Sequence, residues 1–168
     1  MATRRLIECP SVLLTAFVLT LLSCGSPAGI TVPGSPNTKP PAASQYSVAP
    51  NPFPGAINQT GTNVSVTTKT AGGGLITGVN VVMEILPGKD KVITSVLDAG
   101  VDPASTATPP AHFVDTKIKS FTDPTTGTLT MLLKSTGQGD EDELVIIVDP
   151  GGAQEKKLGP FKYVTTVP

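Results

Sequence analysis

Four consecutive acidic residues at positions 140–143 are the sharpest candidate for a binding site in this chain. A hard cation such as Ca²⁺ prefers several carboxylate and carbonyl oxygens, and Asp140, Asp142 and Glu143 would supply the first of them. Their spacing differs from that of an EF-hand loop, and a run of like charges is usually a solvated loop. The pattern therefore favours a solvated loop over a calcium site. The further oxygens of a calcium site would come from other acidic residues near loops: Asp98, Asp102 and Asp149.

His112 is the only histidine of the chain and the one other side chain that suggests catalysis. It follows Pro109 and Pro110 in a segment that reads as a loop. A Ser-His-Asp unit needs a single histidine, but no nucleophile-elbow pattern accompanies this one. We therefore expect a protein that is not an enzyme, with no catalytic residue and no cofactor apart from the calcium considered above.

Cys24 closes an apolar segment near the start of the chain and is a candidate for covalent modification. Arg4 and Arg5 precede the apolar run 11–22, which is too short to span a bilayer but has the order of a secretory signal. The run ends in the sequence Leu21-Leu22-Ser23-Cys24. These features resemble the signal of a bacterial lipoprotein, although Leu22 is bulkier than the residue usual at its position.

The resemblance implies that residues 1–23 are removed as a signal peptide, that the Cys24 sulfur carries a diacylglyceryl group and that the new amino terminus is acylated. Two or more acyl chains hold a protein stably on a membrane, whereas one holds it marginally. Gly25 stands where an aspartate would, by the same resemblance, retain a lipoprotein at the inner membrane. We therefore expect an outer-membrane address in a Gram-negative host. The alternative is an ordinary cleaved signal that leaves a free thiol at Cys24.

The composition of the chain after residue 23 excludes two classes of protein. Cys9 leaves with the signal, so Cys24 is the only cysteine left and no disulfide can form within one chain. Arg4, Arg5 and Glu8 also leave, which reduces 12 basic and 13 acidic residues to ten and twelve. A net charge of about −2 argues against a nucleic-acid-binding surface, which has a strong basic bias. Stability must therefore come from a packed core.

Residues 24–54 have the composition of a linker. Eight prolines lie between residues 27 and 54, among serine, alanine, glycine and threonine, so few apolar residues remain to form a core. A polyproline-like chain extends ~3.1 Å per residue, which would hold a domain far from its lipid. Tyr46 and Phe53 are expected to mark the point where the linker begins to contact the domain. We therefore predict a lipidated Cys24 followed by a disordered, proline-rich linker.

Residues 55–168 have the pattern of one all-β domain. Short alternating segments recur every 8 to 15 positions or so, separated by turn residues, as in a β-sandwich. Phe161 and Tyr163 share one face of the last segment, where core packing is a more probable use than sugar stacking. The continuously apolar segment 144–148 predicts a central strand covered on both faces. The seven predicted strands are 63–68, 76–86, 91–97, 115–121, 128–134, 144–148 and 161–167.

Two short motifs of this domain resemble a known family. The segments 76–81 (ITGVNV) and 122–136 (TDPTTGTLTMLLKST) are similar to landmarks of the bacterial Ig-like modules of invasins and intimins. The resemblance implies an Ig-like antiparallel sandwich of about seven strands and carries no catalytic residues. Asp123 and Gly127 belong to the second motif, where we expect a structural turn because aspartate bonds back to the backbone and glycine tolerates a positive φ.

These observations lead to one functional expectation with two alternatives. We expect a non-catalytic, lipid-anchored module of the cell envelope or surface that binds a protein or glycan, takes part in adhesion, or acts as a spacer. The first alternative is a periplasmic accessory subunit of an envelope complex, and the second is a calcium-binding sandwich. The expected partners are the membrane, through the lipid, and an envelope protein or glycan, with no nucleic acid. The sequence does not fix the oligomeric state.

Overall fold

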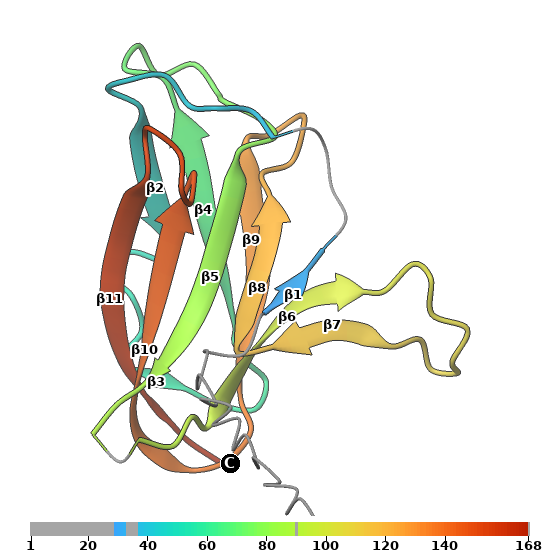
Figure 1. Ribbon diagram of the computed structural model, residues 1–168. Coiled ribbons are helices and arrows are strands. Elements are labelled where there is room, and N and C mark those ends of the chain that lie inside the picture. The colour runs from blue at the N-terminus through green and yellow to red at the C-terminus, as the bar shows by residue number, and fades with distance from the viewer. Residues whose placement is uncertain (1–28, 33–36, 90, 168) are drawn as a thin grey trace, which may run out of the picture.

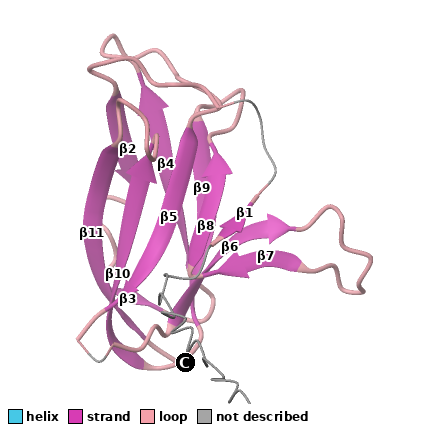
Figure 2. Ribbon diagram, in the orientation of Figure 1, coloured by secondary structure: helices cyan, strands magenta, loops and turns pink. Residues whose placement is uncertain are grey.

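The computed structural model describes residues 29–32, 37–89 and 91–167 of the chain. These residues form strands, turns and loops, with no helix among them, as Figure 2 shows. Nothing in the described ranges therefore provides a helix that could cross a membrane. The predicted signal peptide and the four residues Leu21, Leu22, Ser23 and Cys24 lie outside the described residues.

The described residues form eleven strands in two packed sheets (Figure 1). The larger sheet has the order β1-β8-β5-β10-β11-β3, and the smaller sheet has the order β2-β4-β9-β6-β7. The strands are β1 (Ile30–Thr31), β2 (Gln45–Ala49), β3 (Ala56–Ile57), β4 (Thr62–Lys69), β5 (Asn80–Pro87), β6 (Ser95–Val101), β7 (His112–Asp115), β8 (Lys117–Phe121), β9 (Thr128–Ser135), β10 (Gly139–Val148) and β11 (Lys156–Thr165).

Seven of these strands have the topology of an Ig-like sandwich, which confirms the predicted fold class. In chain order they are β2, β4, β5, β6, β9, β10 and β11, and they assemble as β2-β4-β9-β6 facing β5-β10-β11. This is the ABED and CFG arrangement of Ig domains. The sequence did not predict β1 and β3, which have two residues each, nor β7, of which the predicted strand 115–121 includes only Asp115. Because β1 and β3 pair in parallel with β8 and β11, the larger sheet is mixed rather than antiparallel.

The core lies between the two sheets and is built from alternating side chains. On β4, Val64 and Val66 are fully buried, and on β5 the inward residues Val81 and Met83 are fully buried as well. Alternation buries one face of each strand and leaves the other for solvent or for a covering layer. The predicted central strand is confirmed, because β10 pairs with β5 on one side and β11 on the other, and its segment 144–148 is largely buried.

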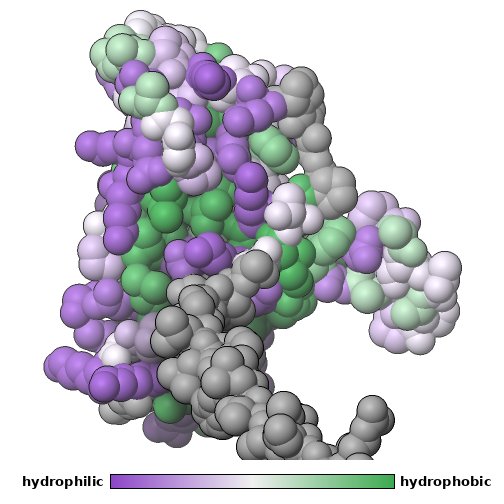
Figure 3. Space-filling view, in the orientation of Figure 1, coloured by the Kyte–Doolittle hydropathy of each residue, from purple (hydrophilic) through white to green (hydrophobic). Residues whose placement is uncertain are grey.

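The outward face of the larger sheet carries an apolar area of its own. Val82 and Val145 lie outside the main core cluster, yet they are only 7% and 2% exposed. Ile147 is the cross-strand partner of Val82. Figure 3 shows hydrophobic side chains in the middle of this face, with hydrophilic side chains around them. This second apolar layer explains why the segment 144–148 is continuously apolar.

The first Ig-like strand is split between the two sheets. Residues 45–49 form β2 and pair with β4 in the smaller sheet, whereas Ala56 and Ile57 form β3 and pair with β11 in the larger sheet. The sequence analysis assigned residues 45–49 to the linker, and the structure instead places them in the sandwich. Prolines at positions 50, 52 and 54 lack an amide donor and end the pairing of the first segment. The chain thus crosses from one sheet to the other between β2 and β3.

The turn between β8 and β9 is stabilised by its own side chains. The Asp123 carboxylate accepts hydrogen bonds from the amides of Thr125 (2.9 Å) and Thr126 (2.8 Å). These bonds lower the pKa of Asp123. Gly127 has a φ of 62°, and an added Cβ would lie 2.8 Å from the carbonyl oxygen of Ile76. A larger residue at position 127 would therefore be strained and would collide with the neighbouring backbone.

Candidate functional site

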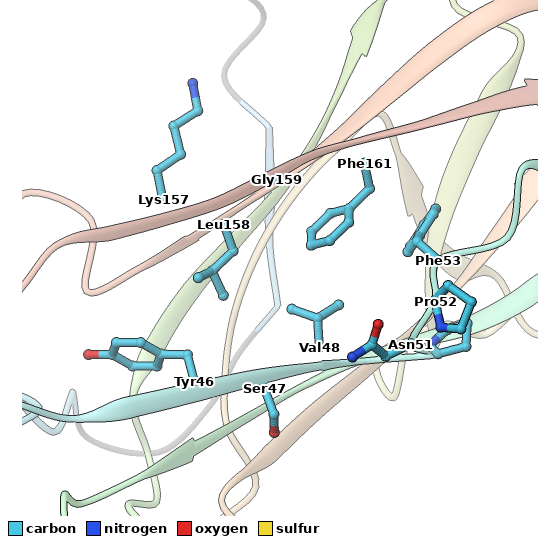
Figure 4. A pocket seen from close by; sticks show the side chains of 11 residues that line it. Tyr46, Ser47, Val48, Asn51, Pro52, Phe53, Lys157, Leu158, Gly159 and Phe161 are labelled. Carbon is cyan, nitrogen blue, oxygen red and sulfur yellow. The ribbon is translucent and has the colours of Figure 1, made fainter.

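A concave region lies on the open side of the sandwich, between β2 of the smaller sheet and β11 of the larger one. Its volume is about 610 Å³. Figure 4 shows Val48 pointing from β2 toward Leu158 and Phe161 on β11. We call this region the β2–β11 groove. It is lined by Tyr46, Ser47, Val48, Pro50, Asn51, Pro52, Phe53, Lys157, Leu158, Gly159 and Phe161.

One end of the groove is closed by aromatic side chains. Phe53, on the segment that crosses between the sheets, stacks on Phe161 with ring centroids 5.0 Å apart and an interplanar angle of 27°. Its ring also lies 6.0 Å from that of the buried Tyr163. This contact between an early segment and the last strand fixes the crossing chain against β11. Pro52 and Phe53 are therefore held as a wall at this end of the groove (Figure 4).

The other end of the groove is open and carries one lysine. Tyr46 and Lys157 lie there, and the Lys157 side chain points away from the interior of the groove in Figure 4. Lys69 is the cross-strand partner of Gln45, so its side chain lies on the face of the smaller sheet opposite to Tyr46. None of Lys69, Lys156 and Lys157 belongs to an ion pair among the described residues, whereas Glu155 bonds to the Gly151 amide. Burial raises the pKa of Tyr46, a hydrogen bond with Ser44 opposes the rise, and the charge of Asp149 adds to it.

A second, smaller concave region lies on the outer face of the smaller sheet, beside a group of paired charges. Asp98 on β6 is 6% exposed and bonds to Lys134 Nζ (2.8 Å) and to His112 Nδ1 (2.9 Å). It also accepts a hydrogen bond from the Gly100 amide (2.9 Å). Burial alone would raise the pKa of Asp98, but these hydrogen bonds and the charge of Lys134 outweigh it and bring the pKa to about 2. We call these residues the Asp98 network.

The Asp98 network contains an aspartate–histidine pair but lacks a nucleophile. The sequence predicts His112 in a loop, whereas the structure places it at the start of β7. Its hydrogen bonds join it to Asp98, and no serine, threonine or cysteine of the described chain bonds to its ring. The adjoining hollow has a volume of about 270 Å³, and Asn63 and Thr130 are among the residues that line it. The arrangement is that of a structural ion-pair network beside a small hollow.

The structure corrects the prediction for the acidic run. Residues 140–143 belong to the strand β10 rather than to a solvated loop. Asp142 is 1% exposed and accepts hydrogen bonds from Ser95 Oγ (2.6 Å) and the Thr94 amide (3.1 Å). Glu143 is adjacent on the strand and pairs with Lys162 on β11 (3.2 Å), as does Glu141 (2.9 Å). The side chain of Asp140 is outside the described part of the structure.

Alternation along the strand explains why the acidic residues do not gather. Successive side chains of a β-strand point to opposite faces, so Asp142 and Glu143 diverge. Asp98, considered as a further ligand, is held in its own network, and Asp149 accepts a hydrogen bond from the Gln154 amide. Within residues 29–32, 37–89 and 91–167, no group of three or more histidine, cysteine, aspartate or glutamate side chains is placed to hold a metal ion.

Part of the groove was predictable from the sequence, and the rest was not. The expected contact of Tyr46 and Phe53 with the domain is confirmed, since both pack against the core cluster. Val48 and Leu158 were missed because each stands in a short segment interrupted by proline or glycine. The signal that would have found β2 is the alternation Gln45-Tyr46-Ser47-Val48-Ala49. Comparison with known proteins adds no relative, because no protein-family model matches the chain and no curated protein is similar to it.

Proposed function

We propose that this protein is a non-catalytic module of the bacterial cell envelope, anchored by lipid at Cys24, whose sandwich domain binds a partner in the β2–β11 groove. The observation that carries the proposal is the groove itself, where apolar side chains remain uncovered beside two strand edges. Apolar concave regions with a few polar groups at their rim are the usual binding sites of proteins. The lipoprotein-like signal, with Gly25 after the cysteine, supports an outer-membrane anchor.

The geometry favours partner binding over a purely spacing role. A spacer needs only a stable sandwich, and it gains nothing from an open apolar groove with a lysine at one end that has no ion-pair partner among the described residues. In contrast, the charges of the Asp98 network are paired within the chain. The proposal therefore assigns binding to the groove and a structural role to the network.

The anchor is tested by incorporation of labelled palmitate into the full chain and into a Cys24→Ser variant. Labelling of the wild type that disappears in the variant supports the anchor. Equal labelling of the two proteins contradicts it.

Partner binding is tested by purifying the full-length protein from chemically crosslinked envelopes. We expect one envelope protein in stoichiometric amount with the wild type, and its loss with Leu158→Asp, which places a charge in the groove. His112→Ala is the control, because it alters the Asp98 network and leaves the groove intact. Recovery of the same partner with Leu158→Asp would contradict a role for the groove, and binding of whole cells or host matrix instead would indicate adhesion.

A further inference from the structure

We infer that the ligand of the β2–β11 groove is an extended polypeptide segment that adds as a strand to the outer edge of β2, with an acidic residue at the open, lysine-bearing end of the groove. The inference rests on the function proposed above and specifies its ligand. It follows from a comparison of the sheet edges, from the shape of the groove and from its charge.

The edges of the two sheets differ in how far they are blocked against pairing. In the larger sheet, the edge strands β1 and β3 have two residues each. The stretch of β11 that β3 does not cover carries Lys156 and Lys157, a bulge next to Gly159, and Pro160, which has no amide donor. Charged residues, bulges and prolines are the usual means by which proteins prevent edge-to-edge pairing. The β11 edge is therefore poorly suited to pairing with a further strand.

In the smaller sheet, the two edge strands contrast in the same way. β7 has four residues and carries the ionisable residues His112 and Asp115. β2, by contrast, has five residues with no charge and no proline, and among the described residues it pairs only with β4. Five residues span ~17 Å, and every second one offers its amide and carbonyl groups to a neighbour on the outer side. β2 is thus the one edge strand of the described sandwich that has five residues and contains no charge, proline or bulge.

The groove gives an added strand somewhere to place its side chains. A strand beside β2 would have one face directed between the sheets, toward Leu158 and Phe161 on β11. Alternate apolar residues of the ligand would fill the groove, and its other residues would face solvent. Main-chain hydrogen bonds supply affinity in strand addition, and the pockets for alternate side chains supply selectivity.

The charge at the open end specifies one further feature of the ligand. Lys157 lines this end of the groove from β11, and Lys156 precedes it on the strand. Since neither lysine belongs to an ion pair among the described residues, a carboxylate on the ligand would complement them. A second copy of this chain would place its own uncharged β2 there, which brings no carboxylate.

The test uses three synthetic peptides with the full-length protein in detergent micelles, and empty micelles as the blank. The first peptide, acetyl-ETVTVTE-amide, places its two valines and both terminal glutamates on one face, so it fits in either chain direction. The second, acetyl-KTVTVTK-amide, reverses the charge. The third, acetyl-EVVTTTE-amide, keeps the composition of the first and breaks the alternation. Binding is followed by isothermal titration calorimetry, and hydrogen exchange is measured on residues 45–49 and, as a reference, on β7.

We expect the first peptide to bind at least tenfold more tightly than either of the others and to slow hydrogen exchange in residues 45–49 but not in β7. Lys157→Glu should weaken its binding about fivefold, as reversal of one exposed charge does, and should improve that of the basic peptide. Lys119→Glu, on the outer face of the larger sheet, makes the same change in net charge and should have no effect.

Equal binding of the three peptides, no binding, or no change in exchange at residues 45–49 would overturn the inference. A dimer that forms through β2 in sedimentation experiments, or binding of soluble glycans in place of the peptide, would also overturn it. In each of these cases, capture of an envelope protein that is lost with Leu158→Asp would still support the proposed function. If neither peptide binding at β2 nor Leu158-dependent capture is observed, both proposals are contradicted.

Discussion

The β2–β11 groove and the Asp98 network are both concave, but they differ in how completely the chain satisfies its own groups. In the network, Asp98 is surrounded by Lys134, His112 and the Gly100 amide. In the groove, apolar side chains stay uncovered and the nearby lysines have no ion-pair partner among the described residues. The difference shows that a concave region with charged residues is not by itself a binding site. What marks a site is a group that the fold leaves unsatisfied.

The largest effect on stability is expected from Asp98→Ala. Removal of this carboxylate leaves Lys134 and His112 without their partner and the Gly100 amide without its acceptor, which should lower the free energy of unfolding by about 2 kcal/mol. His112→Ala is the matched control and should cost less than about 1 kcal/mol, because His112 is 44% exposed and the Asp98–Lys134 pair remains. Urea denaturation measures both values, and equal losses would break the distinction.

The network also predicts a dependence of stability on acid. The pKa of Asp98 is about 2 in the folded protein, against an ordinary value of 3.8. Because the folded value is the lower one, the contribution of Asp98 is complete above pH ~4 and is lost as the pH falls toward 2, by about 2 kcal/mol. Asp98→Asn should therefore lose less stability than the wild type between pH 5 and pH 2. Parallel curves for the two proteins would contradict the role of this carboxylate.

The groove should respond in the opposite way to substitution. Leu158→Asp is expected to lower the free energy of unfolding by only about 1 kcal/mol, because Leu158 is half-buried, yet to weaken partner binding at least tenfold. Asp98→Ala should leave partner binding unchanged under conditions in which it is folded. If both substitutions changed binding in proportion to stability, the contrast between the two regions would fail.

The smallest expected effect is that of calcium. Asp142 is buried and bonded to Ser95, Glu143 is paired with Lys162, and no group of three or more histidine, cysteine, aspartate or glutamate side chains among the described residues is placed to hold a metal ion. The melting temperature should therefore not change in millimolar Ca²⁺, with Mg²⁺ as the control ion. A rise of several degrees with Ca²⁺ alone would restore the calcium hypothesis.

The sequence predicted the sandwich where the alternation was long and failed where it was short or charged. The predicted strand 128–134 corresponds to β9, whose inward residues Leu129, Met131 and Leu133 are all buried. β2 was missed because its five residues lie among prolines, which resemble a linker when no pairing partner is known. Its place in the sheet depends on β4, a contact that local composition does not reveal.

The acidic run shows a different limit of sequence reading. Four like charges in a row predict a loop, because their repulsion and hydration oppose burial. In the structure, Lys162 forms ion pairs with Glu141 and Glu143. The Ser95 hydroxyl donates a hydrogen bond to Asp142 and is also bonded to the Tyr163 hydroxyl (2.8 Å). These partners come from β6 and β11. The groove was beyond prediction for the same reason, since it joins strands that are more than 100 residues apart.

The central claim is that the groove, rather than any other surface, meets the partner, and site-specific photo-crosslinking in living cells tests it most directly. A photoreactive benzoylphenylalanine replaces Leu158 in the groove in one strain and Val114 on β7, which is 42% exposed, in another. We predict one discrete crosslinked envelope protein from position 158 and none from position 114. Crosslinking to the same protein from position 114 alone, or with equal yield from both positions, would contradict the account.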